Sequence, residues 1–399
     1  MGYTAMRGGL EAIQNAEALV TMLRPNAAPD LSAAQVRDHL RAAVDRAMGE
    51  GGLYDCDLAA LAVRQSEGDP AEAALLLRAY RSTLPRLAYS EPCDSEEMDI
   101  VRRITPAFKA APGGQILGRT RDYTQRLLDF TLVEPRIPEG EERHNGHVAS
   151  QPPPRFPKLT AFLREEGLLA VVESATDDPP DDITRDPLRF PASRSARLQA
   201  LARGDTDAMT ALAYSTMRGY GVAHSTLAEL RVGYLPVRVR HPYTGAPVCI
   251  GEIEVTEVED LNISKHTGAA GTEVTRFMPG YGIAFGQNER KAIAMALLDR
   301  AILGGRAGVS QAPAADEEFV LTHIDSIEAA GFLEHLKLPH YVEAQAIMQR
   351  MHALANAELP SAAEAALQPS TAAHGHDGVE ESTVDEHAML HRLGIPHSH

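Results

Sequence analysis

The segment Cys249-Ile-Gly-Glu-Ile-Glu-Val-Thr-Glu-Val258 decides the fold class, because apolar and polar residues alternate along it. A period of two is typical of a β-strand. The segment Leu235–Arg240 alternates in the same way, and Pro242-Tyr243-Thr244-Gly245 between them has the composition of a hairpin turn. A third strand is predicted at Tyr281–Phe285, and a short strand at residues 3–7 near the N-terminus. The second half of the chain should therefore contain antiparallel strands.

Helical periodicity dominates the remainder. The residue Ser32 can cap a helix that reaches Met48, and Asp69-Pro70 is a favourable start for another. Asn288 is predicted to cap a helix after the third strand. The predicted helices cover residues 10–23, 32–48, 58–67, 70–83, 159–174, 193–203, 205–218 and 289–303.

These elements predict an α+β protein with a mostly helical N-terminal part. We divide the chain into a mainly helical region at 1–134, a Pro-rich linker or insertion at 135–158 and an α+β region at 159–357. Residues 358–399 hold seven acidic residues, one Arg and six His, and they predict a disordered tail. The segment 135–158 holds six prolines and has no apolar period.

The composition excludes several classes of function. The chain has 399 residues and a net charge of −17, which disfavours a general nucleic-acid binder because phosphate neutralisation needs cations. No apolar run reaches the length of a membrane span, and no signal peptide is evident. The three cysteines are scattered and odd in number, which is typical of a reducing compartment. We therefore expect a cytoplasmic protein.

Two basic islands interrupt this acidic chain. Residues 102–126 contain six cations and one acid, and residues 185–203 contain five Arg and one Asp. The first island also contains Gly113 and Gly114, where backbone N–H groups could approach a polyphosphate between arginine side chains. The alternative is a solvated surface whose arginines pair with acids elsewhere in the chain.

Other features have both a functional and an ordinary interpretation. Glycine stands between a strand and a helix at Met6–Leu10 and at Phe285–Lys291, and helix N-termini bind anions. Neither segment matches a nucleotide fingerprint, and such helix starts are common. The residues His335 and His340 flank Pro339 and could supply half of a tetrahedral zinc site, or could be ordinary exposed histidines.

Longer strings in the sequence resemble the PhnI family, subunits of the bacterial carbon–phosphorus (C–P) lyase core complex. These strings occur in order from Met6-Arg7-Gly8-Gly9 to about Val342. The strings are Pro112-Gly-Gly-Gln-Ile-Leu-Gly118, Ala213-Tyr-Ser-Thr216, Gly280-Tyr-Gly282, Glu289-Arg-Lys-Ala292, Asp316-Glu-Glu-Phe-Val320 and His335-Leu-Lys-Leu-Pro-His340.

The resemblance implies an enzyme subunit that acts with the G, H and L subunits on ATP and a phosphonate such as methylphosphonate. The phosphonate displaces adenine and gives alpha-D-ribose 1-methylphosphonate 5-triphosphate, and family members alone resemble purine nucleosidases that act on ATP or GTP. The resemblance also implies a hetero-octameric core of G, H, I and J subunits. A zinc ion at the interface with the J subunit would use His335 and His340, with the partner supplying thiolates.

The chemistry of that reaction suggests further candidates from local charge. A nucleoside triphosphate needs cationic contacts and Mg²⁺. We nominate Arg119, Arg121 and Arg126 as the cationic contacts to phosphate or phosphonate. Departure of a base from ribose develops positive charge, so Asp122 or Asp129 is expected near the sugar. A mainly structural subunit remains the alternative. An independent metallohydrolase is disfavoured, because no general-base Glu lies beside the two histidines as in an HExxH motif.

Overall fold

The protein is described here by a computed structural model. The chain divides into two compact units, residues 1–335 and residues 336–399. The expected strand at residues 3–7, most of the Pro-rich segment and nearly all of the expected tail lie outside the described residues. The described residues are 9–23, 31–124, 126–133, 156–170, 179–220, 224–267 and 273–358.

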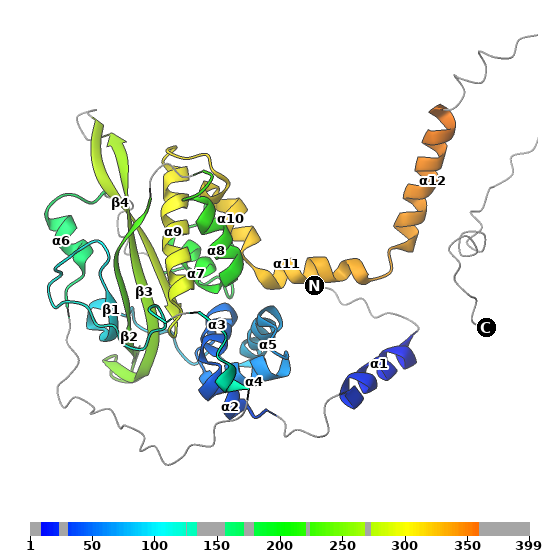
Figure 1. Ribbon diagram of the computed structural model, residues 1–399, viewed down its shortest axis with the longest axis horizontal. Helices are drawn as coiled ribbons and strands as arrows, with labels where there is room; N and C mark the ends of the chain where they lie inside the picture. Colours follow the sequence, from blue (N-terminus) through cyan, green and yellow to red (C-terminus); the bar gives the residue numbers. More distant parts are fainter. Residues whose placement is uncertain are drawn as a thin grey trace, which may run out of the picture. The chain divides into compact units, whose positions relative to one another are not determined.

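One antiparallel sheet forms the centre of the first unit, with its strands in the order β1-β2-β3-β4 (Figure 1). The predicted hairpin is confirmed: Arg240 pairs with Pro247, and the His241 N–H donates to the Ala246 carbonyl at 2.9 Å. The strand at Asp99–Ile104 was not predicted, since its sequence was interpreted only as part of a basic island. The strands are β1 (Asp99–Ile104), β2 (Thr226–Arg240), β3 (Pro247–Thr267) and β4 (Glu273–Phe285).

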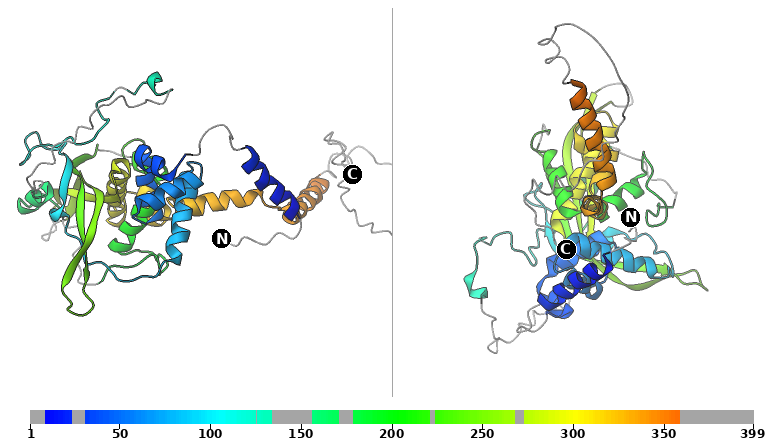
Figure 2. Two further views of the ribbon diagram at one scale, coloured as in Figure 1. Left: turned by 90° about the horizontal axis from the view of Figure 1, so that it is seen from below. Right: turned by 90° about the vertical axis from the view of Figure 1, so that its right-hand side faces the viewer.

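Both faces of the sheet are covered, and Figure 2 shows helices on its two sides. On one face, Val258 packs with Ala292 and Ala296 of helix α9 (Glu289–Arg306). On the other face, Leu261 packs with Leu163 of α6 (Leu159–Glu165). The alternating pattern therefore produces two buried faces, and polar side chains on β3 are enclosed together with apolar ones.

Close packing of α9 on β4 requires two glycines. A Cβ atom at Gly282 would lie 2.0 Å from the Ala292 carbonyl oxygen, and one at Gly280 would lie 2.1 Å from that of Ala296. Only hydrogen leaves room for the helix backbone there. Tyr281 between them directs its side chain to the opposite face of the sheet, as alternation requires.

The N-terminal helices form their own apolar cluster, which includes Val44, Met48 and Leu77. The helix expected from Ser32 to Met48 is in fact two helices, so that prediction was wrong in one respect. Leu40 leaves the helical conformation with φ −110° and ψ 40° and separates them, without a Gly or Pro to signal the break. The helix expected at residues 10–23 is confirmed as α1. The bounds are α1 (Leu10–Leu23), α2 (Ala33–His39), α3 (Arg41–Gly51), α4 (Cys56–Gln65) and α5 (Pro70–Thr83).

Among the described residues, the largest apolar cluster lies where α9 meets α7 and α8, and it includes Leu201, Met209 and Leu298. The helix expected at 159–174 ends earlier, because Gly167 adopts φ +68° after α6. Short 3-10 segments lie at Ser95–Glu97, Phe130–Leu132, Pro313–Ala315 and His335–Lys337. The remaining helices are α7 (Arg194–Arg203), α8 (Thr206–Ser215), α10 (Glu317–His323), α11 (Ser326–Glu334) and α12 (Tyr341–Glu358).

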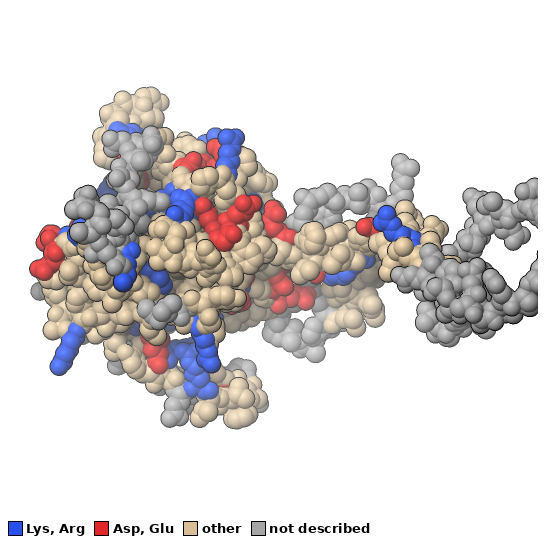
Figure 3. All heavy atoms as spheres, turned by 90° about the horizontal axis from the view of Figure 1, so that it is seen from above, with Lys and Arg blue, Asp and Glu red and all other residues tan. Residues whose placement is uncertain are grey.

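The surface carries both signs of charge. Figure 3 shows lysine and arginine side chains interspersed with acidic ones on the face that it draws, without a continuous basic stripe. Among the described helices, none has the length and apolar character needed to cross a membrane.

Candidate functional site

The first basic island forms strand β1 and the turns that follow it. Arg103 is fully buried and donates to Glu229 on β2 and to the carbonyls of Pro112 and Gly114. Its guanidinium lies 4.7 Å from the ring centroid of Phe156. Arg103 therefore holds the glycine turn in place from inside the protein. It pairs with an acid elsewhere in the chain, as the alternative interpretation of the island predicts.

The glycine turn is shaped by this anchor. Gly113 and Gly114 adopt φ +80° and +71°, and a Cβ at Gly113 would lie 2.1 Å from the Phe156 ring. Gly114 has open space around it, because nothing lies within 4 Å of its ideal Cβ position. Gly113 and Gly114 are both exposed, but the Gly114 N–H already donates to the Ala111 carbonyl at 2.9 Å, so it is engaged within the turn.

The neighbouring Arg102 points to the opposite face of β1 and is 2% exposed. Its Nε donates to Glu289 Oε1 at 2.6 Å in the first turn of α9, and its other nitrogens donate to Asp122 and to the Leu117 carbonyl. The Thr120 hydroxyl, together with Arg102 and Arg126, holds the pKa of Asp122 below its usual value. Asp122, predicted near the ribose, is thus an ionised group beside α9.

The start of α9 brings two features of the sequence together. Gly286 adopts φ +67°, and the Gln287 backbone N–H donates to Asp45 at 3.1 Å. The Gln287 side chain donates to the Arg119 carbonyl at 2.8 Å. The basic island and the strand–glycine–helix segment, which lie far apart in the sequence, therefore meet at the N-terminus of α9.

The polar environment there is mixed in sign. Burial raises the pKa of Asp45, and the guanidinium groups of Arg41 and Arg119 partly offset that rise. Asn288 occupies the N-cap position but makes no capping hydrogen bond, contrary to expectation. The first-turn N–H groups and the helix dipole of α9 therefore lie without a side-chain cap, close to exposed arginine.

The predicted anion-binding side chains are on the surface. Arg119, Arg121 and Arg126 are exposed, and within the described residues none of them forms an ion pair. Asp129 accepts hydrogen bonds from the Thr131 N–H and hydroxyl, at 3.0 and 2.7 Å, and so begins the 3-10 turn at Phe130–Leu132. Asp122, by contrast, is linked to the start of α9 through Arg102.

A second polar cluster crosses the opposite face of the sheet and was missed by sequence reasoning. Glu257 accepts from Arg231, from the Tyr281 hydroxyl at 2.9 Å and from Lys158 at 2.7 Å. Lys158 also lies 3.6 Å from Glu259, which accepts a hydrogen bond from Thr160. The glutamates of the alternating segment could have indicated this cluster. Alternation alone, however, suggested that the face of the strand with the glutamates is exposed to solvent.

This cluster has strongly perturbed titration. Burial alone would raise the pKa of Glu257, but the positive charges of Arg231 and Lys158 lower it by more. The pKa of Glu257 is therefore below its usual value. Burial raises the pKa of Glu259 and, with Glu257, that of Tyr281. Because residues 156–160 cover the cluster and its charges are paired, it stabilises the sheet rather than presenting groups to a ligand.

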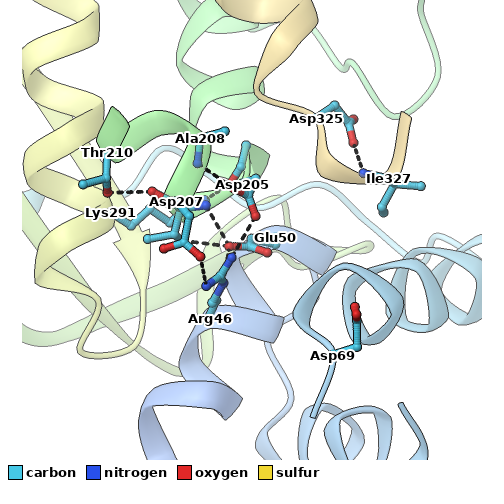
Figure 4. A network of polar contacts seen from close by, with 12 residues as sticks. Arg46, Glu50, Asp69, Asp205, Asp207, Ala208, Thr210, Lys291, Asp325 and Ile327 are labelled. Carbon is cyan, nitrogen blue, oxygen red and sulfur yellow. Dashed lines mark hydrogen bonds and ion pairs between the residues drawn. The ribbon is translucent and has the colours of Figure 1, made fainter. Parts of the chain in front are cut away.

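A third network joins α3, α8 and α9 (Figure 4). Arg46 pairs with Glu50 at 2.8 Å, and with Asp205 and Asp207 at 2.8 and 2.7 Å. Lys291 is completely buried and donates to the Gly204 carbonyl. Burial lowers the pKa of Lys291 to about 8, with Glu50 and Asp205 opposing the shift. Lys291 belongs to one of the strings that carried the resemblance, and here it has a structural role.

The two predicted metal ligands have similar local geometry, each within its own segment. His335 Nδ1 contacts the Phe332 carbonyl at the end of α11, and His340 Nδ1 lies 2.6 Å from the Leu338 carbonyl. A neutral imidazole that donates from Nδ1 carries its lone pair on Nε2, which suits metal binding. Among the described residues, no three His, Cys, Asp or Glu side chains gather as a metal site.

Comparison with known proteins decides the family. The family described as "Bacterial phosphonate metabolism protein (PhnI)" matches residues 2–358. The chain belongs to the PhnI family. The matched PhnI range ends at residue 358, where the expected tail begins.

Two curated PhnI relatives span most of the chain. The Escherichia coli protein "Alpha-D-ribose 1-methylphosphonate 5-triphosphate synthase subunit PhnI" is 48% identical over 355 residues, covering 88% of this chain and 98% of the relative. The Rhizobium meliloti protein of the same name is 46% identical over 351 residues, covering 86% of this chain and 92% of the relative. The resemblance inferred from short strings is therefore confirmed along nearly the whole PhnI sequence.

Proposed function

We propose that this chain is the subunit of a cytoplasmic C–P lyase system that displaces adenine from ATP with methylphosphonate. The product would be alpha-D-ribose 1-methylphosphonate 5-triphosphate, formed together with G, H and L subunits in a core that also holds the J subunit. Two relatives named as synthase subunits are 48% and 46% identical to this chain over most of its length, which supports this assignment. The isolated chain would act as a purine nucleosidase, with water in place of the phosphonate.

The observation that carries the proposal is the meeting of the basic island with the N-terminus of α9. Arg119 and Arg121 are exposed, and Gln287 connects the Arg119 carbonyl to a helix start that has no side-chain cap. Uncapped N–H groups and arginine forks are the usual ligands of phosphate oxygens. The triphosphate would lie here, and bound Mg²⁺ would neutralise part of its charge.

The chemistry requires a substitution at the anomeric carbon of the ribose. A phosphonate oxygen forms a bond to C1′ while the C1′–N9 bond breaks, and adenine leaves with the bonding pair and takes up a proton. Positive charge develops on the sugar and favours a nearby ionised carboxylate. Asp122 is the better of the two candidates, because its lowered pKa keeps it ionised and Arg102 holds it near α9.

A zinc site at the boundary with the J subunit is a separate part of the proposal. The residues His335 and His340 would supply imidazole nitrogens, and the partner would supply thiolates to complete a tetrahedral set. Backbone carbonyls at Nδ1 are the usual outer contacts of such ligands. Zinc there would act as a Lewis acid or would hold the two subunits together.

The test is release of adenine from ATP by the full chain with its partner subunits and methylphosphonate. Arg121→Ala should raise KM for ATP about tenfold or more, because one charge-assisted phosphate contact is worth about 1.5–3 kcal/mol. Arg164→Ala is the matched control, since Arg164 is an exposed arginine on α6, away from the α9 start. Unchanged KM for ATP in Arg121→Ala would contradict the proposed phosphate site.

A mainly structural role is the second candidate, favoured by the paired state of Arg102 and Arg103. In that case the chain would hold the complex together and complete the partner's metal site. The two candidates separate in one assay. No release of adenine or guanine, alone or with G, H, L and methylphosphonate, would leave only the structural role.

A further inference from the structure

A cavity of about 200 Å³ lies at the far end of α9 from the proposed phosphate site. Three parts of the chain line it: the paired ends of β3 and β4, the last turns of α9, and the segments that follow α8 and α9. An α-helix rises 1.5 Å per residue, so residues 300–304 lie roughly 20 Å from the start of α9 at Glu289. The cavity is therefore a separate feature from the convergence of arginines described above.

Two polar side chains that line the cavity make no hydrogen bond to other described residues. Ser264 Oγ is buried and makes no hydrogen bond within the described part of the chain. Asn262 lies two positions before Ser264, on the same face of β3. Its amide likewise has no hydrogen-bond partner among the described residues. A buried hydroxyl without a partner, next to a half-buried amide, offers groups that a ligand can satisfy.

The cavity is close to electrically neutral. Among the described residues that line it, Arg300 is the one with a charge. Asp260 accepts from Arg300 Nε at 2.6 Å, and Ser225 accepts from Nη2 at 2.6 Å. A doubly charged anion would find no further cation there, and a triphosphate would exceed the space. The contents should instead be small, neutral and able to form hydrogen bonds.

The apolar part of the lining favours a flat ring. Met278, Ala301 and Ala315 line the cavity together with Asn262, and thioether sulfur packs well against aromatic edges. An asparagine amide offers a donor and an acceptor side by side, which matches the N6 and N7 edge of adenine. We propose that this cavity binds a free purine base, adenine, apart from the triphosphate. The choice of adenine rests on the proposed function, whereas the size and neutrality of the cavity do not.

Gly304 provides a way to close the cavity. An ideal Cβ at Gly304 meets nothing within 4 Å, so a larger side chain can enter the space without touching backbone. Gly304→Leu should fill it. Ala307→Leu adds the same side chain three residues later, at an exposed position outside the lining, and is the matched control.

The experiment is a titration of the full chain with 2-aminopurine, followed by competition with adenine. The protein contains no Trp, so the fluorescence of the probe is read without a tryptophan background. Adenine should displace the probe. Asn262→Leu should weaken binding about ten- to hundredfold, as loss of a bidentate contact predicts. Gly304→Leu should weaken it at least as much, and Ala307→Leu should bind like the parent.

Several outcomes would overturn the proposal. They are absence of probe binding by the parent chain, unchanged binding by Gly304→Leu, and displacement of the probe by inorganic phosphate or methylphosphonate. Loss of binding in Arg121→Ala with retention in Gly304→Leu would move the base to the α9 start. If Gly304→Leu unfolds in a thermal melt, Asn262→Leu and Ser264→Ala decide instead. Because the titration involves no turnover, a chain that binds the probe but releases no adenine contradicts only the proposed function.

Discussion

Arg102 Nε donates to Glu289 Oε1 at 2.6 Å, and this contact joins two residues that are 187 positions apart in the sequence. It fixes the edge strand β1 against the first turn of α9, with the Arg102 side chain only 3% exposed. The same guanidinium holds Asp122. One buried ion pair therefore positions the carboxylate and the loop of arginines to which we assign substrate contact.

Removing this pair should destabilise the fold as a whole. Arg102→Met leaves the partly exposed Glu289 and Asp122 without their cation, and the lost charge-assisted hydrogen bonds should cost about 1.5–3 kcal/mol. Glu289→Gln should cost less, since the amide still accepts from Arg102. Chemical denaturation with Arg164→Met as the control measures this difference. A loss below about 1 kcal/mol for Arg102→Met would show that the pair is not what fixes β1.

The close approach of β4 to α9 predicts a second stability effect. Gly282→Ala places a Cβ 2.0 Å from a backbone oxygen, and strain of this kind costs about 1–3 kcal/mol or more. Gly49→Ala inside α3 meets its nearest side chain only at 3.5 Å and should be neutral or stabilising by about 0.5–1 kcal/mol. Thermal melts of both variants provide the comparison. Equal melting temperatures would refute the tight contact.

Lys291 predicts a pH dependence of stability. Its pKa falls from 10.5 to about 8 in the folded protein because of burial. Between these values the unfolded chain binds more protons than the folded one, so the free energy of unfolding rises with pH. Lys291→Met removes this titration. The stability of the parent relative to Lys291→Met should rise by about 2 kcal/mol from pH 7 to pH 10. A constant difference would mean that Lys291 keeps its ordinary pKa.

The sequence predicted what depends on near neighbours. The β2–β3 hairpin and the helix after Asp69-Pro70 follow from alternation, turn residues and caps within a few positions. Strand β1 was missed because its arginines are buried only through Glu229 and Glu289, which lie 126 and 187 positions away. No local pattern encodes such partners.

The same limit applies to the candidate site. The exposed arginines and Gly114 were found from composition, but their meeting with the start of α9 depends on the Gln287 contact to the Arg119 carbonyl. The glutamates of β3 looked solvent-facing because the cover at residues 156–160 follows a segment with no periodic signal. Long-range pairing of charges is what sequence reasoning lacked.

Zinc content provides the last prediction, because the chain contains an internal control for its two expected ligands. His323 Nδ1 lies 2.7 Å from the Phe319 carbonyl, with its ring 4.4 Å from the Phe319 ring. His335 contacts Phe332 in the same manner, with ring centroids 5.0 Å apart. The two rings therefore share their local setting, but only His335 has a second histidine five residues later.

Zinc in the complex purified with its J subunit should fall to less than half on His335→Ala or His340→Ala, because each removes one of four ligands. His323→Ala should retain the parent's zinc. Elemental analysis measures the metal, and chelator treatment followed by sizing tests whether it holds the two subunits together. Full zinc in both ligand variants, or an equal loss in His323→Ala, would remove the reason for assigning these two histidines to a metal.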